Sequence, residues 1–188
     1  MSKNATPIEQ KGFTLVELLI VAIILAILAA IVVPQFASST TDAQESALRS
    51  DLAGIRSAVD LYRQQHGENP GVNASNGGTC TGGTKGTGAA GTAAAFRDQL
   101  VRYTNANGDS CSLQNAGGEL FPFGPYLKEN QIPDNPITQS ATIEIVTTGD
   151  LEMVGTGAGL GWKYDSTSGK FIANDTNTDA AGVRYDAY

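Results

Sequence analysis

One acidic residue, Glu17, lies in an apolar run that holds no other charge from Phe13 to Val33. A charge at mid-bilayer costs about 2.5–3.5 kcal/mol on insertion scales, and such residues commonly mark function. Thr14 and Glu17 have the spacing of a capping box, in which the carboxylate accepts from the first amide of a helix. Alternatively, cleavage after Gly12 would make the α-amine of Phe13 a cation four residues from Glu17. Between copies of the chain, Glu17 would then neutralise a neighbour's amine, an attraction that apolar surroundings strengthen.

Residues suited to catalysis or cofactor binding are sparse. His66 is the only histidine, and no nucleophile elbow, metal-ligand cluster or pair of carboxylates stands out. His66 ends a helical stripe, where a cation favours the helix dipole. The glycine-rich stretches Gly82–Gly88 and Gly155–Gly161 lack the spacing of phosphate and dinucleotide loops. The net charge of −7 argues against nucleic-acid binding, which needs clustered Lys and Arg. We therefore expect no enzyme, although a membrane-tethered one is an alternative.

The apolar run is long enough to cross a membrane. Counted from Phe13 to Val33 it has 21 residues, and a span needs about 20. Lys3 and Lys11 precede it, so the positive-inside bias leaves the N-terminus in the cytoplasm and the rest outside. No A-x-A-like pair ends the run, which argues against an ordinary cleaved signal and leaves an uncleaved anchor as the simple alternative.

Helical periodicity continues beyond the apolar run. A single stripe is formed by Leu48, Leu52, Ile55, Val59 and Tyr62. Gly67 is a natural stop, so one helix is predicted from Phe13 to His66, roughly 80 Å long if continuous. Its first half is apolar all round, whereas its second half is amphipathic and suited to holding a head domain. Pro34 lacks an amide and predicts a kink or local break, with the end of a membrane segment as the simpler interpretation.

The remainder, residues 68–188, reads as a small head domain. A Gly-, Thr- and Ala-rich segment, residues 69–95, is predicted to be an exposed loop. A short helix follows at Phe96–Tyr103. Four strands are expected, with a hairpin turn between the last two, at Thr142–Thr147, Leu151–Val154, Leu160–Tyr164 and Lys170–Ala173. Cys80 and Cys111 are expected to form a disulfide if the head is exported.

The stretch "KGFTLVELLIVAIILAILAAIVVPQF", residues 11–36, resembles the class III signal of type IV prepilins and of the pseudopilins of type II secretion. That resemblance implies removal of residues 1–12 after Gly12 and N-methylation of Phe13. It assigns residues 13–34 to a transmembrane and filament-core segment, and residues 35–67 to the amphipathic half of the helix. Glu17 would recruit and align the incoming subunit.

The same resemblance implies an α+β, pilin-like fold, in which the long N-terminal helix packs on a head with a small antiparallel β-sheet. "GPYLKE", "IPDNP" and "GWKYDSTSGKF" in the head resemble the segments that lead into that sheet. Major pseudopilins of this family commonly hold calcium in a C-terminal loop. Here Asp175, Asn177 and Asp179 offer oxygen ligands at alternating positions, but no bidentate Glu follows, so a solvated polar tail is the competing interpretation.

The expected function is that of a structural subunit, major pilin-like, of a type IV pilus-type filament. Implied partners are other copies of the chain, a prepilin peptidase and N-methyltransferase, an inner-membrane platform and an assembly ATPase. The chain would be stored as a single-pass inner-membrane protein with the head outside, then enter an extracellular or periplasmic filament. A major pseudopilin of type II secretion, a DNA-uptake pilin and a membrane-anchored extracytoplasmic enzyme are the alternatives.

Overall fold

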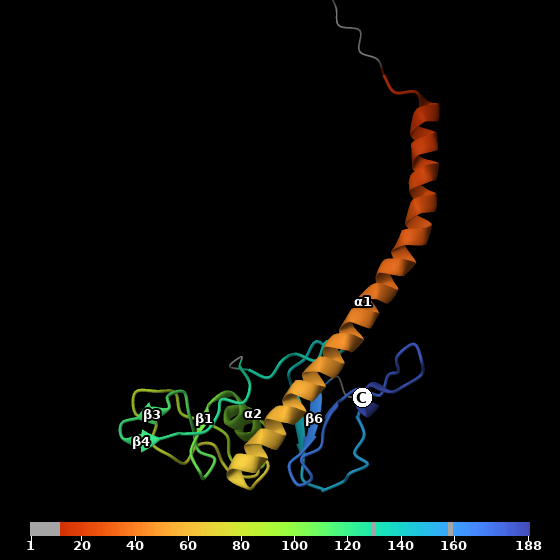
Figure 1. The fold of residues 1–188 in the computed structure, drawn as a ribbon. Helices are drawn as coiled ribbons and strands as arrows, with labels where there is room; N and C mark the ends of the chain where they lie inside the picture. Colours follow the sequence, from red (N-terminus) through yellow and green to blue (C-terminus); the bar gives the residue numbers. More distant parts are fainter. Residues whose placement is uncertain (1–11, 129–130, 158–159) are drawn as a thin grey trace, which may run out of the picture. The chain divides into compact units, whose positions relative to one another are not determined.

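A computed structural model describes residues 12–128, 131–157 and 160–188 of the chain (Figure 1). Two compact units are present, of which the first ends at Ala43 and the second comprises Gln44–Tyr188. Apart from Gly12, the predicted leader lies outside the described residues.

The longest element is helix α1, Leu15–His66, which has 52 residues. Gly67 ends it in the left-handed conformation, with φ of 74°, while its N–H donates to the carbonyl of Arg63 at 2.8 Å. The predicted long helix is therefore confirmed to within two residues at its start. The helix is continuous through Pro34, so a full break at this position is wrong, whereas the expected kink stays a prediction.

The core of the second unit is built on the predicted stripe. Leu48, Leu52, Ile55, Val59 and Tyr62 are each at most 1% exposed. They belong to one cluster with aromatic side chains from later elements, namely Phe96, Trp162, Tyr164 and Phe171. Full burial of a large aliphatic or aromatic side chain contributes about 1.5–3 kcal/mol, so this stripe is the main link between the helix and the rest of the unit.

The other elements are short. They are α2 (Ala93–Val101), β1 (Tyr103–Thr104), β2 (Ser110–Cys111), β3 (Asn115–Ala116), β4 (Glu119–Leu120), β5 (Ile143–Val146), β6 (Trp162–Asp165), β7 (Phe171–Ala173) and the 3-10 turn η1 (Tyr185–Ala187). β1 pairs with β2 and β3 with β4, both antiparallel, and the largest sheet has the order β5-β6-β7.

The largest sheet is mixed, which corrects the expectation of a wholly antiparallel one. β6 and β7 form the predicted hairpin, closed by a turn in which Gly169 N–H donates to the Asp165 carbonyl at 2.8 Å. β5, however, runs parallel to β6. The connection over residues 147–161 is long enough to return the chain to the same end of the sheet, as a parallel pair requires.

The strand predicted at Leu151–Val154 is absent, and this segment forms turns. Thr148 Oγ1 accepts from Asp150 N at 3.3 Å, and Asp150 Oδ1 accepts from Glu152 N at 2.8 Å. Such local side-chain bonds compete with a β-ladder for the same backbone donors. Leu151 is 70% exposed, so its apolar character did not place it in the core.

The glycine-rich segment also departs from expectation. Its last three residues belong to α2, which Thr92 caps by accepting from Ala95 N at 3.2 Å. The segment is not uniformly exposed, since Ser75 and Gly88, for example, are buried. A Cβ added at Gly88 would collide with the backbone of Ala95, so glycine permits this close approach to the helix.

Candidate assembly segment

Glu17 lies in the first turn of α1 and closes a capping box with Thr14. Its Oε2 accepts from the Thr14 N–H and from the Thr14 hydroxyl, both at 2.8 Å, while Glu17 N donates to Thr14 Oγ1 at 3.2 Å. The capping box, the first of the two interpretations of Glu17, is thus formed within the single chain. The second interpretation, in which Glu17 pairs with the α-amine of Phe13 after cleavage, stays a prediction.

The apolar part of α1 is not covered by any of the residues that the structure describes. Leu15–Val33 is long and apolar enough to cross a membrane, and none of this stretch is buried in the structure. Its large side chains are exposed on every side of the helix, from Leu15 at 81% to Val33 at 65%. A helix that is apolar all round needs lipid or other protein around it. A signal sequence near the N-terminus would meet the same criteria of length and composition.

The predicted processing junction is accessible. Gly12 and Phe13 are both exposed, and Phe13 retains 82% of its accessible surface. No atom lies within 4 Å of where a Cβ on Gly12 would be. A protease that requires glycine before the cut bond would therefore meet no obstruction from the described part of the chain.

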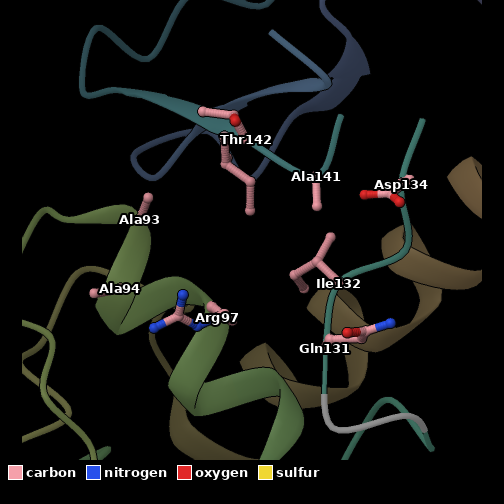
Figure 2. Close-up of a pocket in the computed structure, with 9 residues that line it drawn as sticks. Ala93, Ala94, Arg97, Gln131, Ile132, Asp134, Ala141 and Thr142 are labelled. Atoms are coloured by element: carbon pink, nitrogen blue, oxygen red, sulfur yellow. The ribbon is translucent and has the colours of Figure 1, made fainter. Parts of the chain in front are cut away.

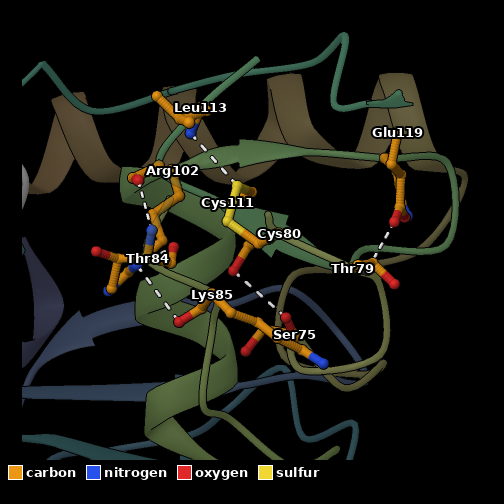
Figure 3. Close-up of a disulfide and its surroundings, with 12 residues drawn as sticks. Ser75, Thr79, Cys80, Thr84, Lys85, Arg102, Cys111, Leu113 and Glu119 are labelled. Carbon is orange, nitrogen blue, oxygen red and sulfur yellow. Dashed lines mark hydrogen bonds between the residues drawn. A yellow bond between two sulfur atoms is a disulfide. The ribbon is translucent and has the colours of Figure 1, made fainter. Parts of the chain in front are cut away.

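Cys80 and Cys111 are joined by a disulfide, with Cα atoms 5.5 Å apart (Figure 3). Cys111 is fully buried and packs with Ala116 and Phe121 in a second, smaller apolar cluster, against which Cys80 and Tyr103 lie. The bridge therefore ties the glycine-rich segment to the β1–β4 region. Disulfides form and persist mainly in oxidising compartments.

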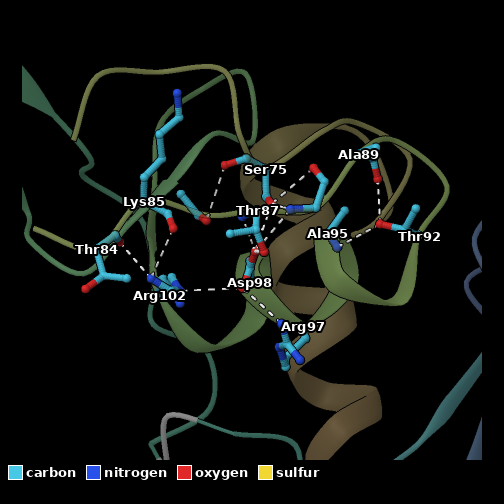
Figure 4. A network of polar contacts seen from close by, with 12 residues as sticks. Ser75, Thr84, Lys85, Thr87, Ala89, Thr92, Ala95, Arg97, Asp98 and Arg102 are labelled. Atoms are coloured by element: carbon cyan, nitrogen blue, oxygen red, sulfur yellow. Dashed lines mark hydrogen bonds and ion pairs between the residues drawn. The ribbon is translucent and has the colours of Figure 1, made fainter.

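Sequence reasoning missed two buried polar residues that organise the glycine-rich segment. Asp98 Oδ2 accepts from Thr87 N at 2.7 Å, from Ser75 Oγ at 3.1 Å and from Gly88 N at 3.3 Å (Figure 4). The neighbouring Gln99 accepts from Gly71 N at 2.6 Å and donates to two further loop carbonyls, those of Asn73 and Gly108. Asp98 and Gln99 belong to no recognisable sequence motif, so their hydrogen-bonding roles become apparent only in the structure.

Asp179, one of the three residues proposed for calcium, already has several partners within the protein. Asp179 Oδ1 accepts from the amides of Ala181 and Val183, and Oδ2 accepts from the Tyr188 hydroxyl at 2.6 Å. Arg49 lies 3.7 Å from the same Oδ2. The Tyr188 hydrogen bond is the largest of the contacts that lower the pKa of Asp179. Protein donors and a guanidinium thus contact this carboxylate, and calcium binding by Asp175, Asn177 and Asp179 stays a prediction.

His66 has a packing role rather than a charged one. Its ring stacks on Tyr62 with centroids 4.0 Å apart, and Nε2 lies 3.0 Å from both Thr104 Oγ1 and the Tyr126 hydroxyl. Burial lowers the pKa of His66, which favours the neutral ring. The cation expected at the end of the helix is therefore disfavoured.

A pocket of about 500 Å³ lies between α2 and the segments 131–134 and 141–143 (Figure 2). Arg97 and Asp134 are its charged lining residues, and alanine and isoleucine side chains make up much of the remainder. The sequence contains no signal for this pocket, because its walls come from segments that are distant along the chain.

Comparison with known proteins agrees with the geometry of the N-terminal segment. Residues 9–33 match the family described as "Prokaryotic N-terminal methylation motif". The exposed apolar helix, the Gly-Phe junction and the glutamate in the first helical turn are thus those of a prepilin-type N-terminal segment. This segment is similar to those of type IV pilins and of the pseudopilins of type II secretion.

Three relatives illustrate both branches of this family. The chain is 44% identical over 55 residues to "Type II secretion system core protein G" of Pseudomonas aeruginosa, covering 29% of this chain and 39% of the relative. It is 48% identical over 68 residues to "Fimbrial protein" of Neisseria meningitidis serogroup B, covering 36% and 40%. It is 32% identical over 65 residues to "Type II secretion system core protein G" of Escherichia coli K12, covering 35% and 45%.

The chain spans about two fifths of the length of the curated relatives it matches. No solved structure matches it. The two relationships have similar extent, so they do not distinguish between a pilus and a secretion pseudopilus.

Proposed function

We propose that this chain is a structural, major pilin-like subunit of a type IV pilus-type filament. In this proposal it is stored in the inner membrane through residues 13–34 and polymerises through the same segment. The observation that carries the proposal is the complete exposure of the apolar span Leu15–Val33, with one carboxylate fixed in its first turn. Lipid would cover this surface before assembly, and the helices of neighbouring subunits would cover it afterwards.

Glu17 supplies the specificity of the packing. Once residues 1–12 are removed, the α-amine of Phe13 is adjacent to Thr14, the residue that already donates two hydrogen bonds to Glu17 Oε2. N-methylation leaves that amine positively charged. When a subunit enters the filament, its Glu17 pairs with the amine of a neighbour, because an unpaired carboxylate among apolar helices is costly. The pairing fixes the axial register of helices whose apolar surfaces would otherwise pack in several alignments.

The remaining steps need partners. A prepilin peptidase with methyltransferase activity would cut after Gly12 and modify Phe13. An inner-membrane platform and an assembly ATPase would extract the subunit from the bilayer. The basic residues Lys3 and Lys11 favour a cytoplasmic N-terminus, and the Cys80–Cys111 disulfide supports a head outside the cytoplasm.

A major pseudopilin of a type II secretion system is the second candidate, favoured by the similarity to core protein G. The head supports the pilus instead, because the glycine-rich segment, the disulfide and the β1–β4 region form an additional cluster beside the main core. Such an elaborated surface suits a filament that presents its heads outside the cell.

The test is the mass of the mature chain isolated from membranes of cells that hold the partner proteins. The proposal predicts loss of residues 1–12 and gain of one methyl group. Electron microscopy of the same cells should then show filaments labelled by antibody against the head, on the cell surface for a pilus. A full-length chain in the membrane, or a chain cut beyond the apolar run, would contradict the filament function.

A further inference from the structure

Three side chains that can react with one another lie on one face of the mixed sheet, away from the aromatic core. Glu144 of β5 is directly opposite Lys163 of β6 in the parallel register. Lys163 is in turn opposite Ile172 of β7, and Asn174 follows Ile172 by two positions. Side chains two positions apart point to the same face of a strand. A carboxylate, a primary amine and a carboxamide are thus gathered from three neighbouring strands.

The carboxylate of Glu144 lies between the amine and the amide. Its Oε1 is 3.7 Å from Lys163 Nζ, while its Oε2 accepts from Asn174 Nδ2 at 2.9 Å. The site is largely closed to solvent, since the side chains of Lys163 and Glu144 are 12% and 29% exposed and Asn174 is fully buried. One acid therefore contacts both the nucleophile and the leaving group of a possible condensation.

Thr156 holds the other end of the Asn174 amide. Asn174 Oδ1 accepts from Thr156 N at 2.7 Å and from Thr156 Oγ1 at 2.9 Å. Donors on a carbonyl oxygen stabilise the negative charge that develops there when a nucleophile adds to the carbon. The Thr156 amide is a fixed donor of this kind, whereas the single hydrogen of the Thr156 hydroxyl is shared with Glu144 Oε2, which lies 3.2 Å away. The amide thus has a fixed donor at its oxygen from Thr156, and its nitrogen lies beside Glu144, the group that would protonate the nitrogen as it leaves.

We propose that Lys163 and Asn174 form an intramolecular isopeptide bond, with Glu144 as the proton carrier. Lys163 first transfers a proton to Glu144, and its neutral amine rotates away from the Val154 carbonyl, to which Nζ donates at 3.1 Å. The Nζ electron pair then attacks Cγ of Asn174, and the oxyanion forms at Oδ1 against Thr156.

Glu144 next gives its proton to Nδ2, so that the Cγ–Nδ2 bond breaks and ammonia leaves. The second proton on Nζ passes through Glu144 to the departing ammonia. The net reaction converts one ammonium group and one carboxamide into one amide and one ammonium ion, and no oxidant or other co-reactant is needed. Proton transfer by a positioned carboxylate of this kind typically accelerates a reaction by about 10²–10⁴-fold.

The bond would close the β6–β7 hairpin covalently. Without it, the hairpin is held by the ladder of a short strand pair, Trp162–Asp165 with Phe171–Ala173. A cross-link between Lys163 and Asn174 would keep this hairpin, and with it the aromatic residues Trp162, Tyr164 and Phe171, in register under force or denaturant. The inference concerns the head alone and does not depend on which filament the chain forms.

The experiment is the mass of the full-length or mature chain, purified and incubated at neutral pH. With the leader and the disulfide accounted for, the wild type should be lighter than its sequence by one ammonia. Tryptic digestion should give a branched peptide joining Lys163 to Asn174. Lys163→Arg keeps the positive charge beside Glu144 but cannot form the bond, so it should restore the full mass, as should Glu144→Gln.

Lys170→Arg is the matched control, because Lys170 also donates to a backbone carbonyl, that of Leu151, beside the same sheet. It should retain the mass loss. A wild-type chain at full mass would overturn the proposal. Loss of ammonia that persists in Lys163→Arg would overturn it too, because the loss would then come from an asparagine succinimide elsewhere in the chain. The branched peptide separates these cases even where a variant folds poorly.

Discussion

Glu17 caps its own helix in the structure, and in the proposed function it also pairs with a neighbouring subunit. Two substitutions separate these roles. Thr14→Ala removes the hydroxyl that donates to Glu17 Oε2 at 2.8 Å and accepts from Glu17 N, yet keeps the charge. Glu17→Gln keeps an oxygen able to accept from the Thr14 amide but removes the charge. If the charge carries assembly, only the second substitution should abolish filaments.

The two substitutions should differ clearly in the free energy that each one costs. Loss of a capping side chain costs about 0.5–2 kcal/mol, which the long helix α1 tolerates. An ion pair at about 4 Å contributes about 4 kcal/mol at an effective dielectric constant of 20. Because each 1.4 kcal/mol is tenfold, loss of the pair should weaken addition of a subunit about a thousandfold. Membrane insertion of Glu17→Gln should be unchanged or improved, since a charge no longer enters the bilayer.

The assay separates sheared filaments from detergent-extracted membranes and quantifies the chain in each by immunoblot. Intact mass confirms leader removal in every variant, and Glu68→Ala, which removes an exposed head carboxylate, serves as the control. Wild-type filament levels in Glu17→Gln would refute the assembly role of the charge. Equal loss in Thr14→Ala and Glu17→Gln would show instead that the capping box is what assembly requires.

Four further predictions concern the head. Replacing both Cys80 and Cys111 with Ser should lower the free energy of unfolding by roughly 3–4 kcal/mol, given their sequence separation of 31, as measured by urea unfolding with and without reductant. Asp98→Ala should cost roughly 3 kcal/mol and expose the glycine-rich segment to limited proteolysis, because it leaves buried donors such as Thr87 N unpaired. Since burial lowers the pKa of His66, its contribution to stability is complete above the ordinary pKa of 6.5 and is lost as pH falls through the folded value; His66→Gln should flatten this part of a pH–melting curve. Calcium or a chelator should leave the melting temperature unchanged, because Asp179 already has hydrogen-bond partners within the protein. A calcium-dependent shift of the melting temperature that Asp179→Asn removes would show instead that calcium binds at this residue.

Much of the fold was predictable where it depends on local pattern. The stripe from Leu48 to Tyr62 is visible at helical spacing, and each of its members is buried. The hairpin between β6 and β7 was predictable because Asp165–Gly169 carries turn residues between two apolar runs. Glu17 stands out for a similar reason, since a lone charge in an apolar run needs a partner.

The rest depends on contacts between distant segments. Whether β5 pairs parallel or antiparallel with β6 is decided by the path of residues 147–161, and no local pattern reports that path. Leu151 and Val154 looked like strand residues, but Thr148 and Asp150 took the local backbone donors into turns. The roles of Asp98 and Gln99 cannot be read from the sequence alone, because their hydrogen-bond partners lie in the glycine-rich segment and beyond, not in adjacent residues.

This division has a consequence for how the chain functions. Residues 9–33 match a known family, and their packing depends on apolar side chains, helical periodicity and the charge of Glu17. None of these properties depends on the head. The head, by contrast, is held by a polar network, a disulfide and short strands, whose residues depend on one another across long separations. Under the proposed function, substitutions in the head would therefore change its surface while the segment that mediates polymerisation stays intact. It follows that exchanging the head after His66 for that of another family member should preserve leader removal and membrane insertion, whereas Glu17→Gln in the same chimera should still abolish filaments.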